Sequence, residues 1–173
     1  MTLPVGYSIS PIGPEDIEGF HRCLDIVARE RRYVAMTEAP PLDRIRDFVD
    51  GGISAGTQRY VAISSGDVVG WCDILPGKNW PGFAHSGVLG MGVHPDHRGQ
   101  GLGRALLDRA VRGAAEAGLR RIELEVFASN VPAISLYLRS GFVVEGCKRR
   151  ARYLDDKYDD VILMAKWIGS EAG

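Results

Sequence analysis

The chain has 173 residues, of which 45% are hydrophobic and 25% charged, and its formal net charge is −1. This length predicts a single domain over residues 1–173, and the composition is that of a globular protein with one core. The balanced charge argues against a nucleic-acid binder, which needs a strong basic excess, and no apolar run is long enough for a membrane helix.

The cysteines give no metal or disulfide pattern. Cys23, Cys72 and Cys147 are widely spaced and form no C-x-x-C pair, so we interpret them as reduced, packed thiols and expect no metal site. Residues 1–5 lack the basic and apolar regions of a secretory leader. We therefore expect a cytoplasmic protein without a membrane partner.

The first third of the chain alternates between strand and helix patterns. Residues 7–10 alternate as a strand does, and a helix is expected to begin at Pro14. Residues 31–41 break the pattern and predict an irregular connection. A shorter helix follows and is expected to end at Gly51–Gly52. The apolar residues expected to face inward from these two helices are Ile17, Phe20, Leu24, Val27, Ile45, Phe48 and Val49.

Three strands are predicted next. Residues 60–63 and 68–75 flank Ser65-Gly66-Asp67, which is typical of a tight hairpin. The third run, 88–93, is interrupted by Gly90 and Gly92. Glycine inside a strand often marks a place where a ligand or another backbone approaches closely.

The last part predicts two more helices and three more strands. A helix over 101–117 ends at Gly118, and a second helix, capped by Asn130, covers 133–139. Strands are expected at 121–127, 142–150 and 161–167. In the first of these, alternation places Glu123 and Glu125 on the face opposite Leu124. The whole order predicts a mixed α/β fold around a mostly antiparallel sheet.

The most informative segment joins the strand at 88–93 to the following helix. Arg98 is followed by glycines at 99, 101 and 103. Glycine adopts positive φ without steric cost, so the backbone can turn sharply and several N–H groups can converge at the start of a helix. Such a turn predicts a binding site for a phosphate or pyrophosphate group.

Two motifs resemble the GCN5-related N-acetyltransferase (GNAT) family. The sequence R-G-Q-G-L-G at 98–103 has the family form (Q/R)-x-x-G-x-(G/A), and N-V-P-A-I-S-L-Y-L-R-S-G-F follows at 130–142. The likeness is concentrated in residues 88–142, and residues 169–173 are expected to be a flexible tail. It implies a sheet of about seven strands flanked by about four helices and splayed between strands 4 and 5, where acetyl-CoA would be wedged.

The resemblance also implies a set of cofactor residues. The pyrophosphate would bind backbone amides of the turn, the pantetheine arm would run along the end of the fourth strand, and a matching asparagine would contact the cofactor. In this sequence those residues are Met91, Gly92, Val93, Arg98, Gly99, Gln100, Gly101, Leu102, Gly103, Arg104 and Asn130.

Acetyl transfer to an amine requires a proton acceptor for the ammonium and a proton donor for the departing thiolate. The resemblance places Tyr137 beside the thioester sulfur, and a neutral phenol can donate that proton. Glu125, in L-E-V at 124–126, matches the glutamate of some family members and would act directly or through water. The fourth strand carries no acid, and His85 near its start is more typical of a turn residue. No covalent enzyme intermediate is required.

The same resemblance assigns acceptor selection to the first two helices and the last hairpin. The residues implicated are Tyr33, Thr37, Glu38, Trp80 and Tyr153. Glu38 would hold an ammonium, and Arg31 or Arg32 a carboxylate, which suits a small primary amine such as an amino acid. The family resemblance and the apolar run 161–168 also allow a homodimer.

Three alternatives stay open from the sequence. An NAD-binding oxidoreductase is disfavoured because G-x-G-x-x-G would need glycine where Arg104 or Leu106 stands. A catalytically silent acyl-CoA sensor on the same fold is compatible with the missing acid on the fourth strand. An acetyltransferase that acts on a protein N-terminus or lysine would need an open acceptor groove.

Overall fold

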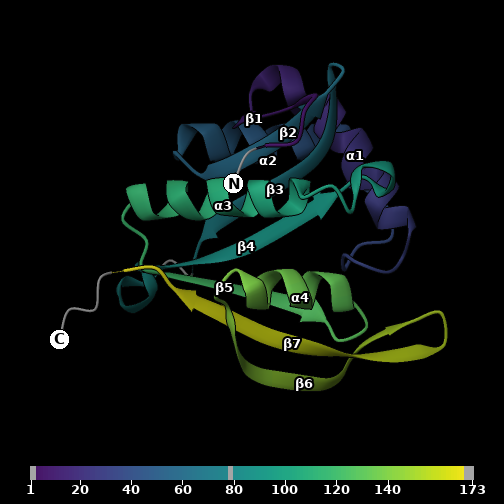
Figure 1. The fold of residues 1–173 in the computed structure, drawn as a ribbon, viewed down its shortest axis with the longest axis vertical. Coiled ribbons are helices and arrows are strands. Elements are labelled where there is room, and N and C mark those ends of the chain that lie inside the picture. Colours follow the sequence, from purple (N-terminus) through teal and green to yellow (C-terminus); the bar gives the residue numbers. More distant parts are fainter. Residues whose placement is uncertain (1–2, 78–79, 170–173) are drawn as a thin grey trace.

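A seven-stranded sheet in the order β1-β2-β3-β4-β5-β7-β6 runs through the protein (Figure 1). The computed structural model describes residues 3–77 and 80–169. The strands are β1 Tyr7–Pro11, β2 Gln58–Ser64, β3 Asp67–Pro76, β4 Ser86–Val93, β5 Arg121–Phe127, β6 Val143–Leu154 and β7 Lys157–Trp167. The helices are α1 Ile17–Arg29, α2 Leu42–Ser54, α3 Leu102–Glu116 and α4 Val131–Arg139, with 3-10 turns at η1 Pro14–Asp16, η2 Pro81–Phe83 and η3 Pro95–His97.

The strands pair antiparallel except at one place. β4 and β5 are parallel, and their ladder covers only Ser86–Val88 against Arg121–Glu123. The crossover between them is α3, as a parallel connection requires. Beyond Val88 the two strands diverge, so the sheet consists of two arms, β1–β4 and β5–β7, joined at one end (Figure 1). This confirms the expected fold class and the splay between strands 4 and 5.

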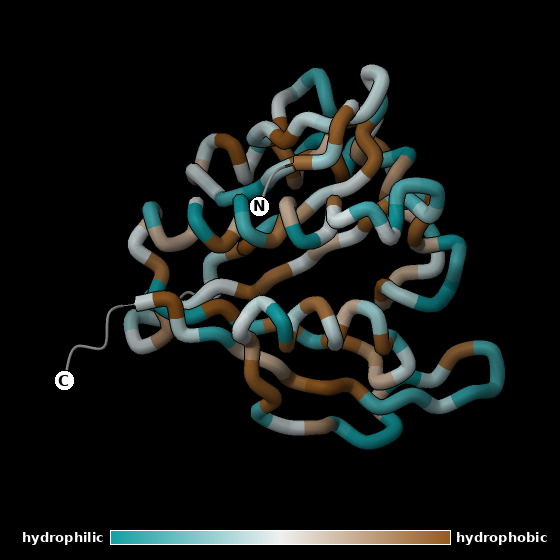
Figure 2. The backbone as a smooth tube through the Cα atoms, viewed as in Figure 1, coloured by the Kyte–Doolittle hydropathy of each residue, from teal (hydrophilic) through white to brown (hydrophobic). Residues whose placement is uncertain are grey.

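Two helical layers cover the sheet. Buried residues of α1 and α2 pack with Val61, Val68 and Trp71 on one face. Buried residues of α3 and α4 pack on the other face with the alternate strand residues, among them Ala62 and Cys72. Figure 2 shows the hydrophobic segments concentrated along the central strands between these layers. No helix among residues 3–77 and 80–169 is both long and apolar enough to cross a bilayer.

Local signals account for most element ends. Gly118 and Gly141 adopt positive φ just after α3 and α4, as glycines at helix C-termini do. In the β2–β3 hairpin Ser65 and Gly66 both have positive φ, which is typical of a two-residue type I′ turn. Asp155 and Asp156 form a turn of the same kind between β6 and β7.

The sequence prediction is wrong in several details. Helix α2 continues through Gly51–Gly52 to Ser54, and Phe48 is 39% exposed instead of facing inward. Cys147 is exposed on β6, not packed in the core. Phe142 lies before β6 and is buried. The expected tail at 169–173 lies outside the described residues apart from Gly169.

A buried ion pair explains why the chain places glycine inside α2. Arg59 and Asp73 are 3% and 6% exposed and lie 3.4 Å apart. The Arg59 guanidinium also donates to the Phe48 carbonyl (3.0 Å) and lies under the Phe48 ring, 3.8 Å from its centroid. A Cβ at Gly52 would lie 2.7 Å from Nη1 of Arg59. The helix therefore needs glycine at 52 to admit the arginine.

The two neighbouring glycines of α2 provide a matched test. Gly51→Ala is expected to raise the free energy of unfolding by up to about 1 kcal/mol, because alanine favours helix and its methyl meets nothing within 4 Å. Gly52→Ala is expected to lower it by about 1–3 kcal/mol because its methyl overpacks against Arg59. Urea denaturation measures both, and equal effects of the two variants would contradict this explanation.

Candidate functional site

The connection between β4 and α3, together with the first three residues of α3, presents a row of backbone N–H groups. We call this segment, residues 94–104, the glycine turn. Gly99 and Gly101 have φ angles of 74° and 84°, and Gly101 is the N-cap of α3. Ala105 donates to the Gly101 carbonyl at 3.1 Å. Within the described residues, the N–H groups of 99–104 donate to no backbone carbonyl. Free donors at a helix N-terminus form a site for an anion.

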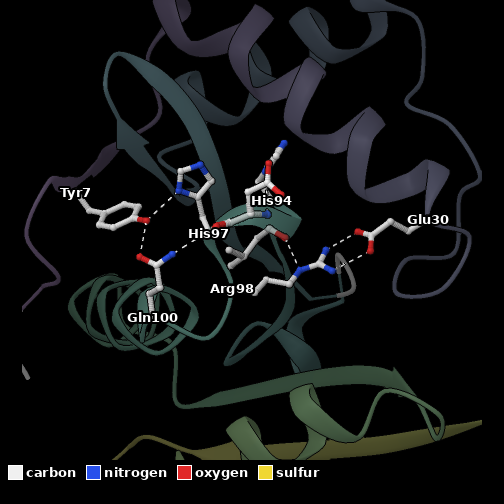
Figure 3. Close-up of polar contacts among 8 residues, drawn as sticks. Tyr7, Glu30, His94, His97, Arg98 and Gln100 are labelled. Atoms are coloured by element: carbon white, nitrogen blue, oxygen red, sulfur yellow. Dashed lines mark hydrogen bonds and ion pairs between the residues drawn. The ribbon is translucent and has the colours of Figure 1, made fainter.

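The side chain of Tyr7 in β1 holds one side of this turn (Figure 3). The Tyr7 hydroxyl lies 2.9 Å from Nδ1 of His97 and donates to Oε1 of Gln100, also at 2.9 Å. Gln100 Nε2 donates back to the Asp96 carbonyl. Gln100 is thus engaged with protein groups on both sides of its amide, and the turn is fixed to the first strand.

Arg98 holds the other side of the glycine turn. Its Nη1 and Nη2 donate to the two carboxylate oxygens of Glu30 at 2.8 and 2.5 Å, and Nε donates to the Val93 carbonyl at 2.8 Å. The guanidinium also lies over the Tyr33 ring, 4.7 Å from its centroid. Figure 3 shows the side chain directed toward Glu30. The Arg98 side chain therefore stabilises the turn. Because its guanidinium is engaged with protein groups, only the backbone of Arg98 is available to an anion.

The first turn of α3 contacts both arms of the sheet. Nε of Arg104 pairs with Asp108, and Nη1 donates to the Arg139 carbonyl at the end of α4 (3.1 Å). A Cβ at Gly103 would lie 3.5 Å from Leu136 and 3.6 Å from Met91. The start of α3 is therefore packed closely between the end of β4 and α4.

The end of β4 has an open edge on its β5 side. The sequence suggested that a ligand requires glycine at positions 90 and 92, but the contacts of this strand with β3 give a different reason. Met91, Gly92 and Val93 pair with β3, whereas their β5 side has no ladder partner among the described residues. A Cβ at Gly92 would lie 2.2 Å from the Trp71 ring, and one at Gly90 would lie 2.8 Å from Asp73. The side chains of β3 thus account for both glycines.

Tyr137 belongs to α4, and its side chain is buried in the core. It is 7% exposed, and its ring contacts Phe142 with 5.7 Å between centroids. Burial raises the pKa of the Tyr137 hydroxyl, and the nearby Cys72 thiol raises it further. Among the described residues this hydroxyl makes no hydrogen bond, and since no fully buried polar side-chain atom there lacks a partner, its oxygen keeps some access to solvent. It is therefore a protonated phenol that remains free to donate.

Asn130 caps the helix that carries Tyr137. Its Oδ1 accepts from the Ala133 N–H at 3.3 Å, and the residue is 9% exposed. This confirms the predicted N-cap, although α4 begins at Val131 and so earlier than expected. A contact of Asn130 with a cofactor stays a prediction.

Glu125 lies on the opposite face of β5 from Tyr137. Its neighbours Leu124 and Val126 are buried with Tyr137, whereas Glu125 is exposed. The carboxylate accepts from Nζ of Lys148 at 2.5 Å. Glu125 therefore contacts β6, and the sheet separates its carboxylate from Tyr137.

Glu125 is one of the residues that line a small open cavity of about 200 Å³. It begins at Val88, where the β4–β5 ladder ends. Arg121 neutralises two of its acids, because it pairs with both Glu123 and Glu145 and holds the pKa of Glu145 below its ordinary value. The lining residues are Val88, Glu123, Leu124, Glu125, Glu145, Lys148, Leu163 and Met164.

The predicted acceptor residues fall into two places. Tyr33, Thr37 and Glu38 lie in the α1–α2 connection, and Tyr153 lies near the β6–β7 turn, at the same end of the sheet as the glycine turn (Figure 1). Trp80 follows β3 at the opposite end of β4, where Pro76 pairs with Gly87, and is 69% exposed. The structure does not bring Trp80 together with the others.

Several of these polar groups already have protein partners. Glu38 lies 3.6 Å from Arg29, and the Tyr153 hydroxyl donates to Asp156 at 2.9 Å. Arg31 pairs with Asp155. An acceptor held by Glu38 or Arg31 would therefore have to share or displace these contacts.

Three residues of this region had no sequence signal. Tyr7 sits in an ordinary alternating strand, and Glu30 ends a helix. Lys148 opens a short basic run that is typical of a solvated strand end. Their partners lie 93, 68 and 23 residues away, so only the fold brings them to the site.

No metal centre is formed by the residues that the structure describes, since no three His, Cys, Asp or Glu side chains gather there. Cys23 and Cys72 are buried, and burial raises the pKa of the Cys23 thiol to about 12. These two thiols are therefore protonated near neutral pH and unsuited to nucleophilic attack.

Comparison with known proteins supplies the family. The model of the acetyltransferase (GNAT) family matches residues 20–142. The ribosomal-protein-serine acetyltransferase of Escherichia coli K12 is 36% identical over 84 residues, covering 48% of this chain and 47% of that protein. The L-amino acid N-acyltransferase MnaT of the same strain is 33% identical over 90 residues, covering 52% of each.

Solved structures agree with the fold. The structure of yncA, a putative acetyltransferase from Salmonella typhimurium with its cofactor acetyl-CoA, superposes with a TM-score of 0.90 at 20% identity and covers 97% of both chains. The chain spans about half the length of the two curated relatives above. The family match itself extends from α1 to Phe142 and includes the glycine turn, β5 and Tyr137. The chain therefore belongs to the GNAT family of acetyltransferases.

Proposed function

We propose that this protein transfers the acetyl group of acetyl-CoA to the primary amine of a small molecule. One observation carries the proposal: the free N–H groups of the glycine turn follow β4, the buried, protonated Tyr137 belongs to the same core cluster as Leu124 and Val126 of β5, and these two strands diverge beyond Val88. A turn that binds phosphate and a phenol that can protonate a thiolate are the two groups that this reaction requires.

The residues present fit acetyl-CoA as a co-substrate. The diphosphate would accept from the backbone N–H groups of 99–104, and the pantetheine arm would lie along the unpaired edge of β4 at Met91, Gly92 and Val93. An extended ligand can use strand N–H and C=O groups as a neighbouring strand would. Arg98 and Arg104 contribute backbone only, because Glu30 and Asp108 hold their side chains.

Because β4 and β5 diverge, a thioester bound between them would be accessible to groups from both faces of the sheet. Beyond Glu123 this strand has no β4 partner, so a thioester lying between the strands has Tyr137 on one side and Glu125 on the other. The amine nitrogen attacks the thioester carbon, a C–N bond forms and the C–S bond breaks. Tyr137 donates its proton to the thiolate, and Glu125 takes the ammonium proton directly or through water.

Lys148 determines how an acceptor can approach Glu125. Its ammonium lies 2.5 Å from the carboxylate, and both side chains are about half exposed. Exposed ion pairs of this kind contribute only about 0–1 kcal/mol. A substrate ammonium can therefore replace Lys148 at Glu125, and the structure offers a place for one positive charge there.

The cavity beside Glu125 favours a small cationic acceptor, because Arg121 pairs with Glu123 and Glu145 and leaves Glu125, whose partner Lys148 is exposed, as the acid that an ammonium can reach. The amino acid acyltransferase among the relatives agrees with this class. The ribosomal-protein acetyltransferase keeps a protein acceptor as the second candidate. Homodimer formation and a cytoplasmic location stay predictions of the sequence.

The glycine turn is tested by binding alone. Gly101→Ala is expected to weaken acetyl-CoA binding about tenfold or more, because an alanine at this positive φ is strained by about 1–2 kcal/mol and the turn must relax. Titration calorimetry with acetyl-CoA measures the affinity, and Gly51→Ala, remote in α2, is the control. An unchanged affinity of Gly101→Ala, or no binding by the parent protein, would contradict the proposed site.

The catalytic roles are tested by paired isosteric variants. Tyr137→Phe and Glu125→Gln are each expected to lower kcat by about 10²-fold or more with little change in acetyl-CoA affinity. Free CoA is followed by disulfide exchange during a screen of amino acids, polyamines, aminoglycosides and peptides. Tyr60→Phe, which removes another buried hydroxyl outside the site, should keep the parent rate.

The outcomes of that screen separate the alternatives. Release of CoA that depends on a small amine supports the proposal, and release only with peptides supports the protein acetyltransferase. Acetyl-CoA binding without any release identifies a silent sensor. Parent rates in both site variants would remove Tyr137 and Glu125 from the mechanism.

The pH dependence of kcat follows from the buried phenol. The ordinary pKa of a tyrosine is about 10, and burial raises the pKa of Tyr137 above that value. A raised pKa keeps the proton on the hydroxyl, so we expect no loss of kcat from this group as pH rises to about 10. A pH–rate profile of the parent and Tyr137→Phe measures this. A fall in the parent that Tyr137→Phe lacks, centred at or below about pH 10, would show that the pKa of this phenol is not raised.

A further inference from the structure

We propose that Glu30 and Arg31, two consecutive residues at the end of α1, tie the glycine turn to the β6–β7 turn, and that Glu30 is a positioning residue for acetyl-CoA binding. This inference rests on the proposed function for the identity of the co-substrate. It adds a link between the two arms of the sheet, a residue, Glu30, that the family motifs do not indicate, and for Arg31 a role other than the acceptor contact expected from the sequence.

The first half of the link is the contact of Glu30 with the glycine turn. Both carboxylate oxygens receive hydrogen bonds from Arg98, and the two side chains are only 26% and 32% exposed. A bidentate pair of this kind fixes orientation as well as distance. Since Arg98 also donates to the Val93 carbonyl, Glu30 sets the position of the backbone that leads from β4 into the turn.

The second half is the contact of Arg31 with the β6–β7 hairpin. Its Nε and Nη2 donate to the two carboxylate oxygens of Asp155 at 2.9 and 2.5 Å. Nη2 of Arg152 donates to the Arg31 carbonyl at 2.5 Å. Three hydrogen bonds therefore join one residue at the end of α1 to the tip of the second arm.

The backbone between the two halves is held in an uncommon conformation. Arg31 has a φ of 56°, which costs an L residue free energy and persists only where its surroundings enforce it. This φ lets adjacent side chains reach opposite arms. A displacement of the hairpin tip is therefore carried to Glu30 through one strained residue.

The link lies where the sheet itself provides none. The β4–β5 ladder ends at Val88, and the glycine turn and the β6–β7 turn both lie at the open end of the splay (Figure 1). Near α3, a hydrogen bond from Arg104 to the Arg139 carbonyl joins α3 to α4, the helices that cover the two arms on that face. The spacing of the arms at this end thus depends on a few side chains, and acetyl-CoA would bind between them.

Linkage makes this arrangement testable from both sides. If the hairpin contact stabilises the turn geometry that binds acetyl-CoA, then acetyl-CoA must stabilise the hairpin contact to the same extent. Loss of Asp155 should therefore weaken acetyl-CoA binding although Asp155 touches neither the turn nor Arg98. A role limited to local stability would leave that affinity unchanged.

The experiment uses Glu30→Gln, Asp155→Asn and the control Asp156→Asn. Asparagine tolerates the positive φ of both turn positions, so the turn is kept and one charge is removed. Asp156 accepts from Tyr153, whereas the hydrogen bonds of Arg31 go to Asp155 and Arg152, and Asp156→Asn should match the parent. Calorimetry with acetyl-CoA and amide hydrogen exchange, with and without CoA, are measured on all four proteins.

We expect acetyl-CoA to bind about 10-fold more weakly to Glu30→Gln and about 3-fold more weakly to Asp155→Asn, with kcat at saturating acetyl-CoA nearly unchanged. In the parent, CoA should slow amide exchange at 152–158, and Glu30→Gln should lose this protection. Parental affinity in Asp155→Asn, or protection of the hairpin that persists in Glu30→Gln, would overturn the link.

Failure of the proposed function would look different. If the parent binds neither acetyl-CoA nor CoA, the co-substrate is wrong, and exchange in the free proteins still decides the link. Asp155→Asn should then speed amide exchange at His97, Arg98 and Ala105, whose N–H groups are hydrogen-bonded within the segment 94–105, relative to Asp156→Asn. Equal exchange of the two variants in that segment would overturn the link independently of any ligand.

Discussion

The short parallel ladder between β4 and β5 is the constraint on which the site depends. Three residue pairs join the arms, and beyond Val88 the facing edges of both strands have no partner among the described residues. Unpaired strand edges are costly unless something satisfies their N–H and C=O groups. In the proposed function an extended ligand arm would do so, and the same divergence would let it reach both faces of β5. Tyr137 and Glu125 would then serve the proposed reaction together although they lie on opposite sides of the sheet.

In the glycine turn the side chains stabilise the conformation, and the backbone N–H groups remain available to a ligand. Tyr7, Glu30 and Asp108 engage the side chains of Gln100, Arg98 and Arg104. Each arginine is balanced by a carboxylate, so the favourable potential for an anion comes from backbone N–H groups and the α3 dipole. A turn fixed by its side chains keeps those amides aligned before the ligand arrives, which lowers the ordering cost of binding.

The sequence predicted those structural features that are determined by residues close together in the chain. Gly118, Gly141 and Asn130 were identified because a helix end is decided within a few residues, and the glycine turn was identified by its own spacing. Gly52 misled the prediction of α2 because its reason is Arg59, which arrives from another element. The Tyr7, Glu30 and Arg31 contacts were missed for the same reason. Cys147 was misplaced because alternation does not show which face of an edge strand meets a helix layer.

Two ion pairs that each join neighbouring strands, Arg59–Asp73 and Lys148–Glu125, show how exposure separates a structural pair from an exchangeable one. Arg59 and Asp73 are buried, and burial raises the pKa of Asp73 despite the nearby guanidinium. Removing either partner would leave an uncompensated charge in the core, so this pair is structural. Lys148 and Glu125 are half exposed, and water can replace either partner at little cost. An exchangeable ammonium beside a carboxylate is what an amine acceptor site needs, because the incoming amine can take the place of the lysine without stranding a buried charge.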